Sequence, residues 1–301
     1  MMKAAIDIGS NTLLLLIAEI SDGKIEVLHE EQQVPRLGKG VDKTGALNIE
    51  SMEIALNGLM HYKRVIDTYG EIPVVVTATS AVRDASNGVA FQERVFEETG
   101  FRFKILSGDE EARVTYQGAL SMLDGHRETS VGVIDIGGGS TEVAIGSNGE
   151  LADYHSFNIG CVRFTERYLG NPPVSQALRE DCRVAIREEL SKVSLPLSDC
   201  QKWCGVAGTV TSLAYLLQNL TEYSTEKINN TVISRADLSY WEEKLGNLTV
   251  QEMEQNWPIV MKGRADIFMA GILILDEILR ISGSDEIVVS TGGVRHGMIL
   301  Q

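Results

Sequence analysis

Two short stretches of the sequence decide the fold: AIDIGSNT at Ala5–Thr12 and VIDIGGGS at Val133–Ser140. In both, apolar residues typical of a buried strand lead to an aspartate and then to a tight turn of small polar residues. A β-rich stretch follows each turn, at Leu13–Ile20 and at Thr141–Ile145, so each copy predicts a β-hairpin. The repeat therefore predicts two homologous α/β halves that face each other across a cleft.

Strand and helix patterns alternate along the rest of the chain, which is typical of α/β proteins with mixed sheets. Further strands are expected at Lys24–His29, Pro73–Ala78, Arg102–Leu106, Glu150–Phe157, Trp203–Val206 and Glu286–Ser290. Helices are expected at Ile49–Tyr69, Val89–Thr99, Ser107–Met122, Val174–Val193, from Gly208-Thr209 onward, Arg235–Leu245, Met261–Ile281 and after Gly293.

The 301 residues suit two domains of roughly 150 residues each. We expect a first domain at 1–125, completed by a C-terminal helix at 293–301, and a second at 126–292, with the boundary in the loop Leu123–Arg127. No segment reaches the roughly 18 apolar residues that a membrane span needs. The sequence thus predicts a cytoplasmic protein without membrane association.

The charge and the cysteines exclude several classes of function. A formal net charge of −15 argues against broad electrostatic capture of nucleic acid. The cysteines, at 161, 182, 200 and 204, show no C-x-x-C spacing and do not indicate a disulfide scaffold or zinc knuckle. A redox or metal element at Cys200 and Cys204 remains an alternative to incidental buried thiols.

Four glycine-rich turns follow predicted strands: Gly9–Thr12, Gly137–Thr141, Gly205–Thr209 and Thr291–Arg295. Because glycine has no Cβ, such turns let backbone N–H groups approach phosphate oxygens. One such turn alone is more often a plain hairpin turn, but four, two of them repeated, indicate a phosphate site. The sequence contains neither a P-loop nor a Rossmann fingerprint. The expected phosphate-binding residues are Gly9, Ser10, Asn11, Thr12, Gly137, Gly138, Gly139, Ser140, Thr141, Gly208, Thr209, Gly292, Gly293 and Arg295.

Asp7 and Asp135 occupy equivalent positions, each at the end of a strand that faces the expected cleft. Carboxylates at such positions can hold Mg²⁺ directly or through water, since magnesium keeps several waters and bridges to substrate phosphates. Alternatively, each aspartate caps its own turn by side-chain hydrogen bonding. The duplication favours the metal-binding interpretation.

Seven motifs together resemble the Ppx/GppA phosphatase family, within the actin, sugar kinase and Hsp70 ATPase superfamily. They begin at Asp7 (DIGSN), Thr77 (TATSAVRD), Leu106 (LSGDEEAR), Asp135 (DIGGGSTE), Gly160 (GCVR), Gly205 (GVAGT) and Gly292 (GGVR), and so cover nearly the whole chain. The resemblance implies a duplicated actin-like, ribonuclease H-like fold and a homodimer. The chain is similar to the short, two-domain form of the family, without the extra C-terminal helical domains of longer members.

The resemblance also implies a catalytic glutamate at Glu111. Local chemistry agrees, because Glu110 can fold back as the capping-box partner of Ser107 and leave Glu111 free. By the same resemblance Glu142 is a second carboxylate at the reaction centre and a metal ligand, although a lone strand glutamate is more often solvated. Arg83 is expected to contact substrate, with a salt bridge to Asp84 or another neighbour as the alternative.

By this resemblance the protein is an exopolyphosphatase that releases terminal phosphate from polyphosphate with Mg²⁺ or another divalent cation. Hydrolysis of the 5′ terminal phosphate of guanosine pentaphosphate is the alternative within the family, because both substrates present a terminal phosphoanhydride. A kinase of the same superfamily would use similar glycine turns for ATP. A sensor that binds without turnover is the remaining, non-enzymatic hypothesis.

Overall fold

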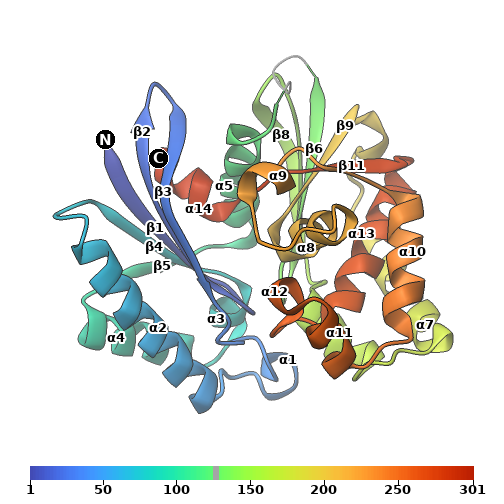
Figure 1. The fold of residues 1–301 in the computed structure, drawn as a ribbon, viewed down its shortest axis with the longest axis horizontal. Coiled ribbons are helices and arrows are strands. Elements are labelled where there is room, and N and C mark those ends of the chain that lie inside the picture. Colours follow the sequence, from blue (N-terminus) through green and yellow to red (C-terminus); the bar gives the residue numbers. More distant parts are fainter. Residues whose placement is uncertain (125–128) are drawn as a thin grey trace.

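The structure is a computed structural model that describes residues 1–124 and 129–301. Two mixed β-sheets stand side by side (Figure 1), one with the strand order β3-β2-β1-β4-β5 and the other with the order β10-β11-β9-β6-β7-β8. The strands are β1 Met2–Ile8, β2 Leu13–Ser21, β3 Lys24–Gln33, β4 Val74–Ala78, β5 Phe103–Ile105, β6 Ser130–Ile136, β7 Thr141–Ser147, β8 Glu150–Phe157, β9 Lys202–Val206, β10 Val232–Ser234 and β11 Glu286–Val289.

The two sheets share one topology. Strand β1 is antiparallel to β2 and parallel to β4, and β6 is likewise antiparallel to β7 and parallel to β9. The third strand of each half, β3 or β8, continues the antiparallel side. Each half therefore contains the same hairpin and crossover arrangement, and the predicted duplicated α/β fold with mixed sheets is confirmed.

Helices cover the outer faces of both sheets. In Figure 1, α2 and α4 flank the first sheet, while α7, α10 and α13 lie beyond the second. The helices are α1 Val41–Thr44, α2 Ile49–Asp67, α3 Ser80–Asp84, α4 Gly88–Thr99, α5 Gly108–Ser121, α6 Cys161–Phe164, α7 Gln176–Leu190, α8 Ala207–Leu217, α9 Thr225–Ile228, α10 Arg235–Gly246, α11 Val250–Asn256, α12 Pro258–Met261, α13 Phe268–Ser282 and α14 Val294–Leu300, with a π-helical turn at Thr165–Leu169 and a 3₁₀ turn at Leu197–Asp199.

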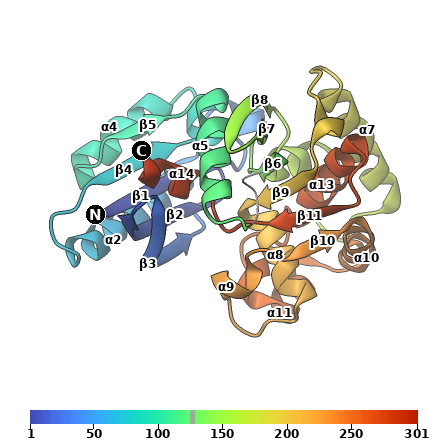
Figure 2. The same cartoon turned by 90° about the horizontal axis from the view of Figure 1, so that it is seen from above.

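Helices α5 and α14 lie between the two sheets (Figure 2) and pack directly on each other. A Cβ on Gly118 would lie 2.0 Å from the carbonyl oxygen of Gly293, and one on Gly297 would lie 1.9 Å from that of Val114. Glycine is required at these positions because the two backbones touch. The last helix of the chain thereby returns to β1 and β2 of the first sheet.

The placement of α14 agrees with a first domain that is completed by residues 293–301. The division into 1–125 and 126–292 nevertheless stays a prediction, and residues 125–127 of the expected boundary loop lie outside the described residues. Within residues 1–124 and 129–301, the structure contains no helix with the length and apolar character to cross a bilayer.

One predicted helix is wrong. The apolar pattern at Met261–Ile281 predicted a single helix, but α12 ends at Met261 and α13 begins only at Phe268. Between them Gly263 adopts a left-handed conformation with φ +74°, which ends the helix and turns the chain. The residues of this turn then face the cleft. Arg83 lies in the short helix α3, which follows β4.

Candidate active site

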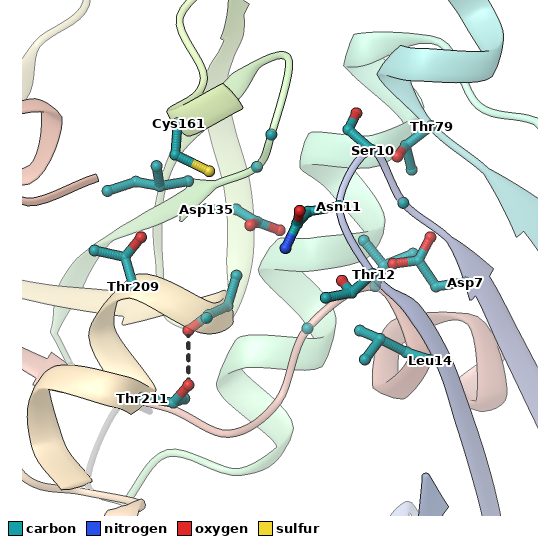
Figure 3. Close-up of a pocket in the computed structure, with 18 of the residues that line it drawn as sticks. Asp7, Ser10, Asn11, Thr12, Leu14, Thr79, Asp135, Cys161, Thr209 and Thr211 are labelled. Carbon is teal, nitrogen blue, oxygen red and sulfur yellow. Dashed lines mark hydrogen bonds between the residues drawn. The ribbon is translucent and has the colours of Figure 1, made fainter. Parts of the chain in front are cut away.

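A pocket of about 180 Å³ lies between the two halves, at the ends of the repeated hairpins (Figure 3). Most of the predicted site residues line it: Asp7, Gly9, Ser10, Asn11, Thr12, Glu111, Asp135, Gly137, Gly138, Gly208, Thr209, Gly292, Gly293 and Arg295. The others, Gly139, Ser140, Thr141, Glu142 and Arg83, are not part of the lining. The four glycine-rich turns thus meet around one pocket, although they are far apart in the sequence.

The two hairpin turns are closed by equivalent hydrogen bonds. The Gly9 amide donates to the Thr12 carbonyl oxygen at 2.9 Å, and the Gly137 amide donates to the Ser140 carbonyl oxygen at 3.0 Å. Because these first amides are occupied, any phosphate bound here would have to contact other amides of the turns. The turns also touch each other, since a Cβ on Gly138 would lie 2.7 Å from the Ser10 Cβ.

Some of the predicted polar side chains are bound within the protein. The Ser10 hydroxyl lies 2.8 Å from the Ser80 hydroxyl and accepts a hydrogen bond from the Ala81 amide, at the start of α3. Thr141 Oγ1 donates to the Ile159 carbonyl oxygen at 2.7 Å. These two hydroxyls therefore fix the turns, and the turns supply backbone groups to the pocket.

Asp7 and Asp135 face the pocket from β1 and β6 (Figure 3). Burial, followed by the charge of Asp135, raises the pKa of Asp7 to about 7. Burial raises the pKa of Asp135 to about 6, and a hydrogen bond from Thr115 opposes the rise. Buried carboxylates with raised pKa values bind a cation readily, because a positive charge offsets the unfavourable burial of their negative charges.

Glu142 lies behind Asp135 on the neighbouring strand. The register of β6 and β7 pairs these two residues directly, so Glu142 points inward and is 2% exposed. Burial, and next the charge of Asp135, raises the pKa of Glu142 to about 7, while a 2.6 Å hydrogen bond from Ser156 stabilises the anion. In the first half the residue that pairs with Asp7 is Leu14. The repeat is thus asymmetric, and only the second half brings an extra carboxylate.

Glu111 enters the pocket from the first turn of α5 and is 6% exposed. The predicted capping box is confirmed: Ser107 accepts from the Glu110 amide, and the Glu110 carboxylate accepts from the Ser107 amide. This leaves the Glu111 carboxylate free of the cap. Burial, followed by the charge of Glu142, raises the pKa of Glu111 well above its usual value.

Arg83 holds Glu111 in place. Its Nη1 donates to Glu111 Oε2 at 3.0 Å and to the Leu106 carbonyl oxygen at 2.8 Å. Its Nε lies 3.9 Å from Asp84 Oδ1, so the structure contains the salt bridges that were the alternative to substrate contact. The positive charge of Arg83 opposes the rise in the Glu111 pKa. Arg83 therefore acts on the pocket through Glu111.

The carboxylates fit a magnesium ion, with water completing its shell. Within the described parts of the chain, no three acidic, histidine or cysteine side chains come together as a metal site, so Asp7, Asp135 and Glu142 do not form a closed ligand set. However, Asp7 Oδ1, Asn11 Oδ1 and Glu142 Oε2 are buried oxygens that accept no hydrogen bond. Such orphaned acceptors suit a hard cation that also keeps water and substrate oxygens.

Two arginines line the pocket from the second half and the last helix. Arg295 Nη1 donates to the Leu15 carbonyl oxygen at 2.7 Å, and Nη2 lies 3.2 Å from Glu30 Oε1. Arg264 was missed by the sequence reasoning, because it lies within the helix that was wrongly predicted. Its Nη1 donates to the Gly208 carbonyl oxygen and to Ser212 Oγ. Nearby, Ala207 lines the pocket with φ +66°, a strained conformation for alanine.

Residues 16–301 match the model of the Ppx/GppA phosphatase family. The chain belongs to the Ppx/GppA phosphatase family. Exopolyphosphatase 2 of Mycobacterium tuberculosis is 32% identical over 99% of this chain and 97% of that protein. A bifunctional 3-dehydroquinate synthase/phosphatase of Fusobacterium nucleatum is also 32% identical, and the chain spans only 46% of its length.

Two solved structures are similar over nearly the whole chain. The Aquifex aeolicus family member superposes with a TM-score of 0.83 at 32% identity, covering 100% of this chain and 96% of that one. An exopolyphosphatase from Cytophaga hutchinsonii gives a TM-score of 0.87 at 27% identity, covering 99% and 96%. The fold is therefore the duplicated actin-like fold expected of a Ppx/GppA phosphatase.

Proposed function

We propose that this Ppx/GppA phosphatase is an exopolyphosphatase that releases terminal phosphate from inorganic polyphosphate, with Mg²⁺ or another divalent cation. One observation carries the proposal: the buried Glu111 carboxylate, free of the helix cap and with a raised pKa, faces a pocket between two glycine-rich turns. A general base works best when its pKa lies near the working pH. The similarity to Exopolyphosphatase 2 of M. tuberculosis supports the same conclusion.

The reaction needs a positioned water and neutralised phosphate oxygens. Glu111 takes a proton from water while the water oxygen bonds to the terminal phosphorus. The bond from that phosphorus to the bridging oxygen breaks, and orthophosphate and a shortened chain leave. Arg83 orients Glu111, and the amides of the turns at Gly9–Thr12 and Gly137–Ser140 hold the phosphates. Mg²⁺ held by Asp7 and Asp135, with Glu142 behind them, would neutralise charge on the phosphate oxygens.

The second candidate is hydrolysis of guanosine pentaphosphate at its 5′ end. A guanosine-5′-triphosphate,3′-diphosphate pyrophosphatase of Pseudoalteromonas translucida is 28% identical over 98% of this chain, which spans 58% of that relative. The apolar residues of the pocket wall favour this candidate as an additional substrate. We also propose that the protein is cytoplasmic and forms a homodimer. Light scattering of the purified protein gives its molecular mass and so tests the dimer.

Phosphate release without any acceptor tests the hydrolase against a kinase. The purified protein is incubated with polyphosphate or guanosine pentaphosphate, with Mg²⁺ or with a chelator. We expect steady release of orthophosphate from polyphosphate that stops on chelation. A protein that transfers phosphate only when a hydroxyl or nucleotide acceptor is added would contradict the proposal, as would binding without turnover.

The metal assignment has a readout apart from activity. We expect Mg²⁺ to raise the melting temperature of the wild type, because a bound cation offsets the free-energy cost of burying two negative carboxylates. Asp7→Asn should remove much of this rise. Asp109→Asn is the matched control, because Asp109 is an exposed carboxylate in the first turn of α5. An equal Mg²⁺ response in all three proteins would contradict the assignment.

A further inference from the structure

Part of the pocket lining is apolar, which a chain of phosphates does not need. Leu14, Tyr223, Ile267 and Phe268 all line the pocket. Inorganic polyphosphate has no apolar surface to place against them, and apolar side chains cannot replace the hydration of its oxygens. Ligand pockets with this mixture usually bind a molecule that has an apolar body as well as polar groups.

Tyr223 is the aromatic side chain of this wall with the most exposed surface. It belongs to the loop between α8 and α9 and is 50% exposed, although it borders a pocket. Thr211 of α8 also lines the pocket, and its Oγ1 donates to the Ala207 carbonyl oxygen. The exposed half of the Tyr223 surface leaves part of the ring available for contact with a ligand.

Tyr223 and Glu111 line the same pocket from different elements. Glu111 comes from the first turn of α5 and is bound by Arg83 of α3. Tyr223 comes from the loop between α8 and α9. Asp7 and Asp135 line the pocket as well (Figure 3). A substrate whose terminal phosphate meets Glu111 can therefore place its other end against Tyr223.

A cation lines the same pocket as Tyr223. It is the guanidinium of Arg264, which follows the turn at Gly263. Among the described residues no carboxylate forms a salt bridge with it, whereas Arg36, Arg163, Arg167 and Arg295 at or near the cleft all have acidic partners. A guanidinium without an acidic partner, in a pocket that also has an aromatic lining residue, suits a ligand with both phosphates and an aromatic ring.

We propose that Tyr223 is a specificity-determining residue that stacks on the base of a nucleoside 5′-polyphosphate, while the terminal phosphate of that substrate lies at Glu111. This inference rests on the proposed hydrolase function and adds a subsite to it. Inorganic polyphosphate uses the phosphate part of the same pocket and gains nothing from the ring. Because stacking needs only a π face, adenine and guanine are both accepted.

Three substrates and two variants test this subsite. We would measure kcat/KM for guanosine 5′-tetraphosphate, adenosine 5′-tetraphosphate and inorganic tripolyphosphate with the wild type, Tyr223→Ala and Tyr223→Phe. Loss of one base–aromatic stack corresponds to a decrease of about 5- to 150-fold. We expect Tyr223→Ala to show this decrease for both nucleotides and to leave tripolyphosphate unchanged. Tyr223→Phe keeps the stacking face and should behave as the wild type.

Several results would overturn the inference. An equal loss for all three substrates would mean that Tyr223 only supports the pocket, and no loss for nucleotides would mean that the ring is not used. A loss in Tyr223→Phe as large as in Tyr223→Ala would assign the effect to the Tyr223 hydroxyl and not to the aromatic face. Failure of the wild type to hydrolyse tripolyphosphate would instead refute the proposed function. In that case, the affinity of the wild type and both variants for guanosine 5′-tetraphosphate, measured by calorimetry, still tests the subsite. Weaker binding only to Tyr223→Ala supports it, and equal binding to all three proteins contradicts it.

Discussion

Replacing Arg83 with methionine should move the pH dependence of catalysis to higher pH. The Arg83 Nη1 lies 3.0 Å from Glu111 Oε2, and its charge holds down a pKa that burial and Glu142 raise. Two unit charges about 4 Å apart interact by about 4 kcal/mol at an effective dielectric constant near 20. This corresponds to about three pKa units, and water that enters beside the shorter side chain reduces it to about one or two.

The assay is the pH profile of kcat/KM for polyphosphate at constant free Mg²⁺. Glu111 must be deprotonated to accept a proton from water, so activity appears as the pH rises through its pKa. In Arg83→Met this rise in kcat/KM should occur about one to two pH units higher than in the wild type, and activity should recover toward alkaline pH. Arg83→Lys retains the charge and should shift less. If kcat/KM fell by the same factor at every pH and the apparent pKa of the profile stayed the same, the electrostatic role of Arg83 would be refuted.

Three further predictions concern stability and domain contact. Burial holds the pKa of His296 at about 3, below its value in the unfolded chain. When the pH falls from 7.5 to 5, the free energy of unfolding, measured with urea, should therefore decrease by about 2 kcal/mol more in the wild type than in His296→Leu. The same pH dependence of this free energy in both proteins would contradict the prediction. Gly118→Ala should lower the free energy of unfolding by about 1–3 kcal/mol or more, because its Cβ would meet the Gly293 carbonyl oxygen. Gly293→Ala is the control: a Cβ there has open space, so this variant should keep the wild-type melting temperature. A Gly118→Ala variant as stable as the wild type would be evidence against the α5–α14 contact. Asp42 accepts hydrogen bonds from Arg163 and Arg167 across the two halves. Asp42→Asn should therefore increase the radius of gyration measured by small-angle X-ray scattering, as high salt should in the wild type. An unchanged radius of gyration would show that other contacts hold the halves together.

The sequence predicted those features that local chemistry determines. The repeated strand, aspartate and turn predicted both hairpins, because short apolar runs and small polar turn residues act within about ten positions. The capping box at Ser107 and Glu110 predicted where α5 begins, and this placed Glu111 one residue beyond the cap. The side of the sheet that Glu142 faces was left open, because it depends on the pairing of β6 with β7.

The sequence did not reveal features that arise from contacts between distant segments. Arg264 and Tyr223 belong to no motif. Arg264 follows the turn at Gly263 that comes after α12, and Tyr223 lines the pocket from the loop between α8 and α9. The apolar residues on both sides of that glycine continue with helical spacing, so periodicity alone hid the break. The pairing of Arg83 with Glu111 was also missed, since α3 and α5 meet only after β4 and β5 are placed in the sheet.

The most direct test of the account compares Glu111→Gln with Glu110→Gln. Both variants remove one negative charge from adjacent residues of α5, but Glu110 serves the helix cap and glutamine can take over that role. We predict that Glu111→Gln lowers kcat for polyphosphate by at least about 100-fold, with substrate affinity retained, and that Glu110→Gln stays close to the wild type. Substantial phosphate release by Glu111→Gln, or an equal loss in both variants, would contradict the claim that Glu111 activates the attacking water.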